Sequence, residues 1–238
     1  MIEWAYGITT CADRLGTTLE RTLHSLEETG FANPRLFIDG AQRLPGEYSG
    51  EVTCRWPPIT VYANWILGLV ELYVRQPRAD YFAIFQDDLI CCKGLRDYLE
   101  AWHPRHSYLN LYTHEQNHDI GRDKSGWFPS NQMGKGALAL VFRREAVVDL
   151  FESKHIVRRP MDWTVRSTRS IDGAVCEALC RRNDGGVVYI EYVHNPSLVQ
   201  HADGPSGSVI GNPYGRTAPN FAGEDFDVRR MLPEVRQC

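Results

Sequence analysis

The sequence has 238 residues, of which 43% are hydrophobic and 24% charged, and a formal net charge of −4. This composition is typical of a globular domain and excludes a disordered chain, and the charge gives no general attraction to nucleic acid or anionic lipid. No stretch approaches the ~18 consecutive apolar residues of a membrane span, and no charged segment followed by an apolar one opens the chain, so we expect a cytoplasmic protein with no stable membrane span. The seven cysteines lack metal-site spacing and predict reduced thiols.

The first forty residues predict a strand, a helix and a second strand. Residues 4–11 form a β-rich run, and leucines at positions 15, 19, 23 and 26 recur at helical spacing before a glycine. The apolar segment 35–39 then ends on Asp-Gly, as a short buried strand does. This strand–helix–strand order is typical of a parallel sheet.

The later elements continue this alternation. Thr60 can cap a helix that stops before Pro77, and the apolar run 81–85 predicts a central strand. Residues 114–136 are polar and contain several glycines, which favours a long functional loop. The remaining pattern predicts helices near 95–102, 145–151 and 171–179, and strands near 52–56, 108–112, 137–142 and 187–193. We therefore predict a single α/β domain with a mixed sheet flanked by helices.

The strongest local signal for chemistry is Gln86-Asp87-Asp88, at the end of the predicted central strand. A buried strand delivers the residues at its carboxyl end to the rim of an open α/β sheet, where ligands bind. Carboxylates at that place suit Mg²⁺ or Mn²⁺ and leave coordination positions for the oxygens of a diphosphate. A solvated acidic turn after a strand is the alternative interpretation.

With its neighbours, this motif resembles that of the GT-A glycosyltransferases, which is Asp-X-Asp or Glu-Asp-Asp at this place. The resemblance covers most of the chain. It implies a Rossmann-like GT-A fold, a nucleotide-sugar donor (UDP-sugar favoured), and Mn²⁺ or Mg²⁺ as cofactor. Gln86 departs from the motif, where an acid is usual, so the resemblance assigns the metal to Asp88, with Gln86 and Asp87 at the donor. It also implies a donor-binding role for five earlier residues: Thr9, Thr10, Arg14, Asp39 and Asn64.

Gly134-Lys135-Gly136 resembles the family's glycine loop near the donor. Glycines let backbone amides approach an anion without a side-chain clash, and Lys135 adds positive charge. A plain turn into the following strand is the alternative.

The segment Ser170-Ile-Asp172-Gly resembles the one that carries the catalytic base of inverting members. Such a base takes a proton from the acceptor hydroxyl. Asp172 also opens a predicted helix, where capping or complementing the helix dipole is the alternative role. Asp162 is the rival base.

The segment from Val193 to His201 ends in Ser-Leu-Val-Gln-His, which is similar to a run in the N-acetylglucosaminyltransferase IV group and its bacterial relatives. In many GT-A enzymes a histidine here completes the metal site. The resemblance therefore implies that His201 and Asp88 bind the metal together, and a purely structural His201 is the alternative. We interpret His194 as structural.

The resemblance as a whole implies a metal-dependent, inverting hexosyl- or N-acetylhexosaminyltransferase. Residues 1–112 would form the nucleotide-sugar-binding half, and residues 113–238 the acceptor-binding and catalytic half. Two other classes stay open: a metal-dependent phosphoesterase or nuclease, and a non-catalytic sugar-binding module. The acceptor could be a glycan, a protein or a hydroxymethylated base in phage DNA, and the basic segment 154–169 could contact it or be a solvated loop.

Overall fold

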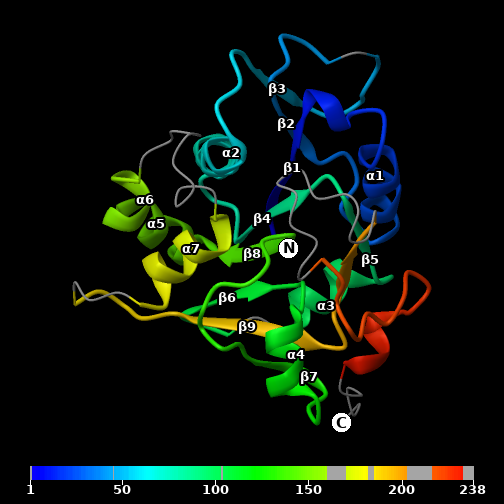
Figure 1. Cartoon of the computed structure of the whole chain (residues 1–238), viewed down its shortest axis with the longest axis vertical. Helices are drawn as coiled ribbons and strands as arrows, with labels where there is room; N and C mark the ends of the chain where they lie inside the picture. The colour runs from blue at the N-terminus through cyan, green and yellow to red at the C-terminus, as the bar shows by residue number, and fades with distance from the viewer. Residues whose placement is uncertain are drawn as a thin grey trace.

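An eight-stranded mixed β-sheet with helices on both faces forms the centre of the molecule (Figure 1). The structure is a computed structural model and describes residues 2–44, 46–102, 104–159, 170–181, 185–202 and 216–232. The predicted fold class, a Rossmann-like mixed α/β sheet flanked by helices in a single domain, is confirmed. The strands, in their order across the sheet, are β3 (Val52–Arg55), β2 (Arg35–Asp39), β1 (Trp4–Cys11), β4 (Tyr81–Gln86), β8 (Ala139–Arg143), β6 (Ser107–Asn110), β9 (Ile190–Asn195) and β7 (Gly126–Pro129).

The first half of the sheet is parallel and the second half is mixed. β1 pairs in parallel with β2 and β4, and β2 pairs in parallel with β3. β8 is antiparallel to both of its neighbours, β4 and β6. The order β3-β2-β1-β4 is that of a mononucleotide-binding half, in which the chain leaves β1 on one side and returns on the other. The carboxyl ends of β1 and β4 therefore border the crevice where such sheets bind ligands.

Two hydrophobic layers hold the helices to the sheet. Along β4, Ala83 and Phe85 face one layer while Phe82 and Ile84 face the other, as the two-residue period of a strand requires. Figure 1 shows α5, α6 and α7 grouped on one side of the sheet, away from α1 and α3. The helical elements are α1 (Leu19–Glu28), α2 (Val61–Arg75), α3 (Leu95–Ala101), α4 (Glu115–Gly121), α5 (Arg144–Glu152), α6 (Lys154–Val157), α7 (Ile171–Leu179) and the 3-10 turns η1 (Ala12–Arg14) and η4 (Val228–Met231).

A separate two-stranded ladder joins distant parts of the chain. β5 (Leu89–Cys91) follows directly after the acid pair, and it pairs antiparallel with β10 (Val199–His201). The amide of Ala202 also donates to the carbonyl oxygen of Asp88, 2.6 Å away. This ladder places His201 beside the end of β4.

The predicted boundaries of β1, β2, β4 and α2 agree with the structure to within one or two residues, and Thr60 caps α2 by accepting a hydrogen bond from Ala63. The interpretation of residues 114–136 as a loop is wrong in part, because they contain α4 and β7. The side-chain amide of Asn195 donates to the carbonyl oxygens of Gly121 and Lys124, and β7 pairs with β9, so contacts with a distant strand order this segment.

The structure bears on two expectations for the whole chain, namely the lack of a membrane span and the reduced state of the cysteines. None of the helices within the described ranges is both long and apolar enough to cross a membrane. Six cysteines are described and all six are free thiols, while Cys238 lies outside the described residues.

Candidate functional site

The acid pair lies at the junction of β1 and β4, where the sheet topology places the crevice. Asp87 and Asp88 follow β4 and are 4% and 1% exposed. Thr9 of β1 is in register with Gln86 of β4, so Thr10 lies beside Asp87. The hydroxyl of Thr10 donates to Oδ2 of Asp87 over 2.5 Å. Buried carboxylates destabilise a fold unless they are paired or bind cations, so we expect positively charged groups next to this pair.

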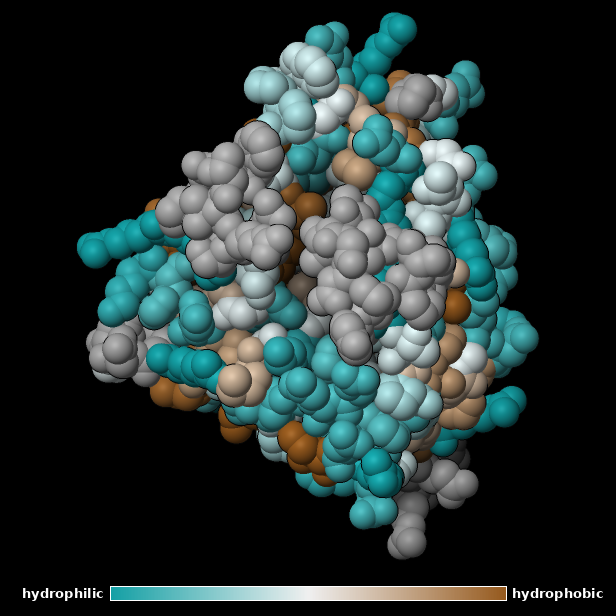
Figure 2. All heavy atoms as spheres, in the orientation of Figure 1, coloured by the Kyte–Doolittle hydropathy of each residue, from teal (hydrophilic) through white to brown (hydrophobic). Residues whose placement is uncertain are grey.

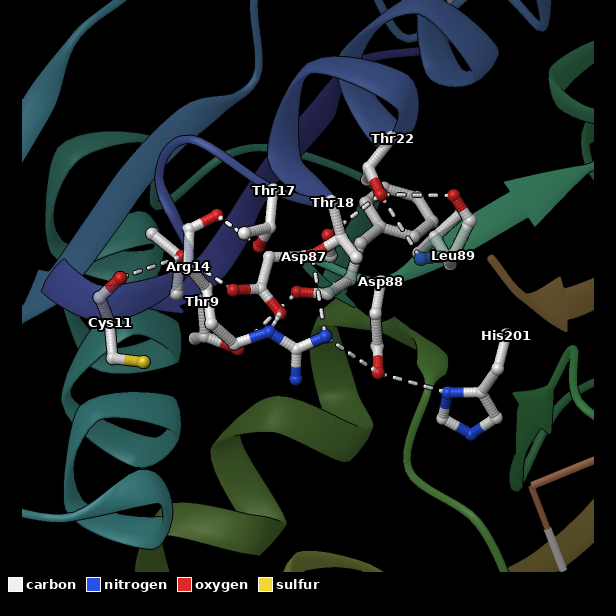
Figure 3. A network of polar contacts seen from close by, with 12 residues as sticks. Thr9, Cys11, Arg14, Thr17, Thr18, Thr22, Asp87, Asp88, Leu89 and His201 are labelled. Carbon is white, nitrogen blue, oxygen red and sulfur yellow. Dashed lines mark hydrogen bonds and ion pairs between the residues drawn. The ribbon is translucent and has the colours of Figure 1, made fainter. Parts of the chain in front are cut away.

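Three cationic or ionisable groups meet at one oxygen of Asp88. Arg14, Arg216 and His201 approach Oδ2 of Asp88 to 3.2, 2.7 and 3.1 Å, respectively. Arg14 also approaches Oδ1 of Asp87 to 3.4 Å. Figure 3 shows the Arg14 guanidinium reaching both carboxylates, and His201 approaching Asp88 from the opposite side. The site therefore brings positive and negative side chains together at the carboxyl ends of β1 and β4.

The same contacts separate the proton affinities of the two acids. Burial raises the pKa of Asp87 to about 6, against the opposing effects of Arg14 and Thr10. Burial also acts to raise the pKa of Asp88, but His201, Arg14 and Arg216 outweigh it and hold that pKa below its usual range. Asp88 therefore stays ionised to a lower pH than Asp87 does.

Thr22 of α1 fixes the turn that carries the two acids. Its hydroxyl lies 2.9 Å from the carbonyl oxygen of Asp87 and 3.0 Å from that of Leu89, and it accepts a hydrogen bond from the Leu89 amide. Thr22 is fully buried. The side chains of the acid pair therefore project from a backbone held by both the sheet and a helix.

A second cluster joins the glycine loop to the start of α7. The amide of Gly136 donates to Oδ2 of Asp172 over 2.7 Å, while Ser170 and the Gly173 amide donate to Oδ1. Gly134 has a φ of +63°, and a Cβ there would lie 2.3 Å from the carbonyl oxygen of Asp172, so only glycine fits this close approach. The N-cap of α7 is Ser170, so Asp172 is not the capping residue itself.

Tyr112 connects the two clusters. Its buried ring lies 5.3 Å from the His201 ring, centroid to centroid. On the other side, a Cβ on Gly136 would come within 2.5 Å of the same ring. The acid pair with His201, and the glycine loop with Asp172, are thus neighbours across one aromatic side chain, although 84 residues separate Asp88 from Asp172 in the sequence.

Several residues predicted to bind the donor use their polar groups within the protein. The Asp39 carboxylate accepts from the amides of Ile59 and Thr60. The Asn64 side chain donates to the carbonyl oxygens of Thr10 and Phe37. These contacts link the carboxyl ends of β1 and β2 to the start of α2.

Two further predicted residues also make contacts inside the protein. Thr9 donates to the carbonyl oxygen of Phe85, and the Gln86 side chain donates to that of Ala137. A donor-binding role for these residues, and for Asp39 and Asn64, stays a prediction.

Part of the predicted acceptor side lies outside the described residues. This applies to Asp162 and to residues 160–169 and 203–215. Of the basic segment, α6 is described, and Arg159 lies over the ring of Tyr62 at 5.3 Å and 3.7 Å from Glu177. Arg158 is exposed. The two arginines therefore have different surroundings, and only Arg158 is exposed to a partner.

Sequence reasoning missed three residues of the site: Thr22, Tyr112 and Arg216. Arg216 lies in a polar, glycine-rich stretch with no periodic pattern, so no local signal identifies it. Thr22 does carry a signal, because it is a polar residue one position from the leucine stripe of α1 and fully buried. Tyr112 is the last residue of the predicted strand 108–112, and its parity with Tyr108 and Asn110 would place it among buried residues.

A depression lies next to this site. It has a volume of about 480 Å³ and is lined by η1 and by the segment after β2, including Leu15, Arg43 and Leu44. Both linings follow the carboxyl ends of parallel strands. Figure 2, which shows the molecule in the orientation of Figure 1, has a hollow near its centre with hydrophobic atoms on its floor.

Two side chains at the acid pair fit a divalent cation. Oδ1 of Asp88 is buried and has no hydrogen-bond partner among the described residues. With the imidazole of His201 it offers one oxygen and one nitrogen ligand, which suits Mn²⁺ and leaves positions for phosphate oxygens. No cluster of three or more His, Cys, Asp or Glu side chains fit for a metal occurs in the described ranges. The residues fit a cation that is completed by its substrate.

Comparisons with known proteins give no family. No protein-family model matches the chain, and no curated protein matches its sequence. Among solved structures, HddC from Yersinia pseudotuberculosis gives a TM-score of 0.42 at 8% identity over 82% of this chain and 93% of that one, and its complex with GMP-PN gives 0.37 at 10% over 60% and 79%. A glycosyltransferase involved in glycosylation of the major capsid of PBCV-1 gives 0.41 at 12% over 80% and 94%. Similarities this low identify neither a family nor a function for this chain, and the likeness to the N-acetylglucosaminyltransferase IV group stays a prediction.

Proposed function

We propose that this protein is a metal-dependent glycosyltransferase that moves a sugar from a nucleotide-sugar, with a UDP-sugar favoured, to an acceptor hydroxyl. The observation that carries the proposal is the buried pair Asp87–Asp88 at the carboxyl ends of β1 and β4, surrounded by Arg14, Arg216 and His201. A transfer from a nucleotide-sugar releases a diphosphate. Basic and acidic side chains placed together at the carboxyl ends of strands suit the binding of a diphosphate with its counter-ion.

Asp88 and His201 would hold the divalent cation, with Asp87 beside it. When bound, Mn²⁺ or Mg²⁺ would neutralise the charge that develops on the leaving diphosphate. Arg14 and Arg216 now neutralise Asp88, and once a cation takes that role, their guanidinium groups become available to phosphate oxygens. The depression between η1 and the segment after β2 is the place that we propose for the nucleoside.

Asp172 is our proposed catalytic base. The base of an inverting transfer removes the proton of the acceptor hydroxyl on the side opposite the leaving group, and Asp172 lies across Tyr112 from the acid pair. Its carboxylate is held by three donors, which fixes its direction. Lys135, between the glycines of the Gly134–Gly136 loop, would bring positive charge to an anionic donor, while the Gly136 amide stays on Asp172.

The two alternatives are less well supported. A two-metal phosphoesterase or nuclease needs a dense group of acidic and histidine ligands, whereas the described residues give only the pair with His201. A sugar-binding module would have no need of two buried acids that must be neutralised. The acceptor stays open among a glycan, a protein and a modified DNA base, and Arg158 is an exposed residue of the basic segment with which to test it.

The test is a nucleotide-release and transfer screen. The purified protein with Mn²⁺ is incubated with UDP-, GDP- and CMP-sugars, with and without acceptors of the three classes, and released nucleotide is measured. We expect release from one nucleotide class, its loss in EDTA, and a fall of roughly 10³-fold in Asp88→Asn, because the neutral amide is a poor metal ligand. His24→Asn, an exposed histidine variant away from the site, is the control. Full activity in EDTA would exclude metal dependence, and release from no sugar nucleotide would exclude the transferase.

A further inference from the structure

A second buried acid lies outside the acid pair, on β9. Glu191 is 1% exposed, and burial raises its pKa. Its two oxygens are occupied, Oε2 by the hydroxyl of Ser130 at 2.5 Å and Oε1 by the side-chain amide of Asn110 at 3.0 Å. A buried carboxylate destabilises a fold unless every oxygen is paired. Here both oxygens are paired, and one of the two partners, Asn110, leads to the glycine loop.

Asn110 connects Glu191 to the glycine loop through hydrogen bonds. The Asn110 side chain is fully buried at the end of β6. Its nitrogen Nδ2 lies 3.0 Å from the carbonyl oxygen of Lys135 and 2.7 Å from that of Gly136, as well as 3.0 Å from Glu191. Its oxygen accepts from the amide of Tyr112. One side chain thus joins β6, β9 and the loop.

The acceptor oxygen of Glu191 helps to fix which end of the Asn110 amide faces the loop. Oε1 of Glu191 accepts from Nδ2 of Asn110, so the NH₂ group of Asn110 faces Glu191. The same NH₂ group then meets the carbonyl oxygens of Lys135 and Gly136. Without that acceptor, only the two loop carbonyl oxygens and the Tyr112 amide would hold the Asn110 side chain, and the loop would be less firmly fixed.

The far end of this chain of contacts is Asp172. With its carbonyl oxygen held by Asn110, Gly136 directs its amide at Oδ2 of Asp172, 2.7 Å away. Gly134 of the same loop packs against the backbone of Asp172. We propose that Glu191 is a positioning residue, which acts through Asn110 and the Gly134–Gly136 loop to orient Asp172. This inference rests on the proposed function, in which Asp172 is the base.

The test compares two substitutions of Glu191. Glu191→Met keeps the length but removes both acceptors, whereas Glu191→Gln keeps an acceptor oxygen for Asn110. We expect Glu191→Met to lower kcat by roughly 10- to 100-fold, as small misplacements of a catalytic group do, and to leave the donor Kd within about twofold. Glu191→Gln should restore most of kcat. Glu71→Met, which removes an acid bonded to Arg35 and Arg75 near the opposite edge of the sheet, is the matched control and should lower only the Tm.

Hydrogen exchange of the Gly136 amide gives a readout that needs no activity. We expect it to quicken in Glu191→Met, and to stay at the wild-type rate in Glu191→Gln and Glu71→Met. Unchanged exchange at Gly136 overturns the inference, and so does faster exchange with an unchanged kcat. If Glu191→Met does not fold, Asn110→Ser replaces it, because serine is too short to reach the two loop carbonyl oxygens. A wild-type protein inactive toward every sugar nucleotide refutes the proposed function, and exchange at Gly136 then decides the positioning contact alone.

Discussion

Lowering the pH should unfold this protein partly through one buried histidine. His194 is fully buried on β9, and its ring nitrogens lie 2.7 Å from the hydroxyl of Tyr98 and 2.6 Å from the carbonyl oxygen of Pro196. The carbonyl oxygen only accepts, so Nδ1 carries the proton and Nε2 accepts from Tyr98. Burial lowers the pKa of His194 to about 4, with the Pro196 contact acting in the opposite direction.

The sign and size of the effect follow from this pKa. An unfolded histidine titrates near pH 6.5, so below that pH the unfolded chain takes up a proton that folded His194 refuses until about pH 4. Its contribution is therefore complete above about pH 6.5 and is lost as the pH falls toward 4. Between pH 7.5 and 5.0 the loss in the free energy of unfolding is about 2 kcal/mol.

The assay is urea unfolding at these two pH values, followed by tryptophan fluorescence. His194→Asn keeps a donor for the Pro196 carbonyl oxygen and cannot be protonated, so its pH-dependent loss should be smaller than the wild-type loss by about 2 kcal/mol. His24→Asn is the control, because the His24 side chain is 75% exposed. Because the pKa of Asp87 is raised, this residue makes the folded protein more stable as the pH falls, which opposes the effect of His194. Only the difference in pH-dependent loss between the wild type and His194→Asn is therefore diagnostic. Equal losses in wild type and His194→Asn would refute the reasoning.

Three other predictions follow from the site. Asp172→Asn should lower transfer by roughly 10²- to 10⁴-fold while donor binding stays near normal, and an α-linked donor should give a β-linked product; the anomeric coupling constant by NMR checks this, and an α product contradicts the inverting mechanism. Gly134→Ala should destabilise the protein by more than about 1–2 kcal/mol in thermal or urea unfolding, and clearly more than Gly126→Ala, which has a similar positive φ but nothing near its Cβ; equal costs would remove the close approach to Asp172. Arg216→Gln should tighten Mn²⁺ binding without nucleotide by about tenfold, measured by electron paramagnetic resonance, because a competing cation leaves Asp88; weaker binding would mean that Arg216 does not compete with the metal.

Elements that a single strong pattern specifies could be predicted from the sequence. β4 contains a run of five apolar residues, followed by Gln86 and the acid pair, and α2 begins after a capping threonine, so both were placed within a residue or two. β5 and β10 could not be predicted in this way. Each has three residues, and their pairing depends on contacts between positions more than a hundred residues apart.

The site was predictable only where the sequence groups residues together. Asp87 and Asp88 are adjacent and follow a strand, and His201 ends a family-like run, and the structure brings all three together. Arg216 and Glu191 are isolated polar residues, and only the tertiary structure gives them partners. For Glu191 a weak signal existed, because it shares the parity of buried Val193, while Ile190 is 41% exposed, opposite to what hydrophobicity alone predicts.

The ladder between β5 and β10 also means that the acid pair is synthesised well before the histidine that faces it. The parallel half of the sheet and the turn with Asp88 leave the ribosome early, but His201 follows 113 residues later. A nascent chain that ends before β10 can therefore form the first strands and the acid pair without the imidazole that faces Asp88. Such an intermediate would hold a buried carboxylate short of one partner, so the turn that ends β4 should stay labile until β10 docks beside β5.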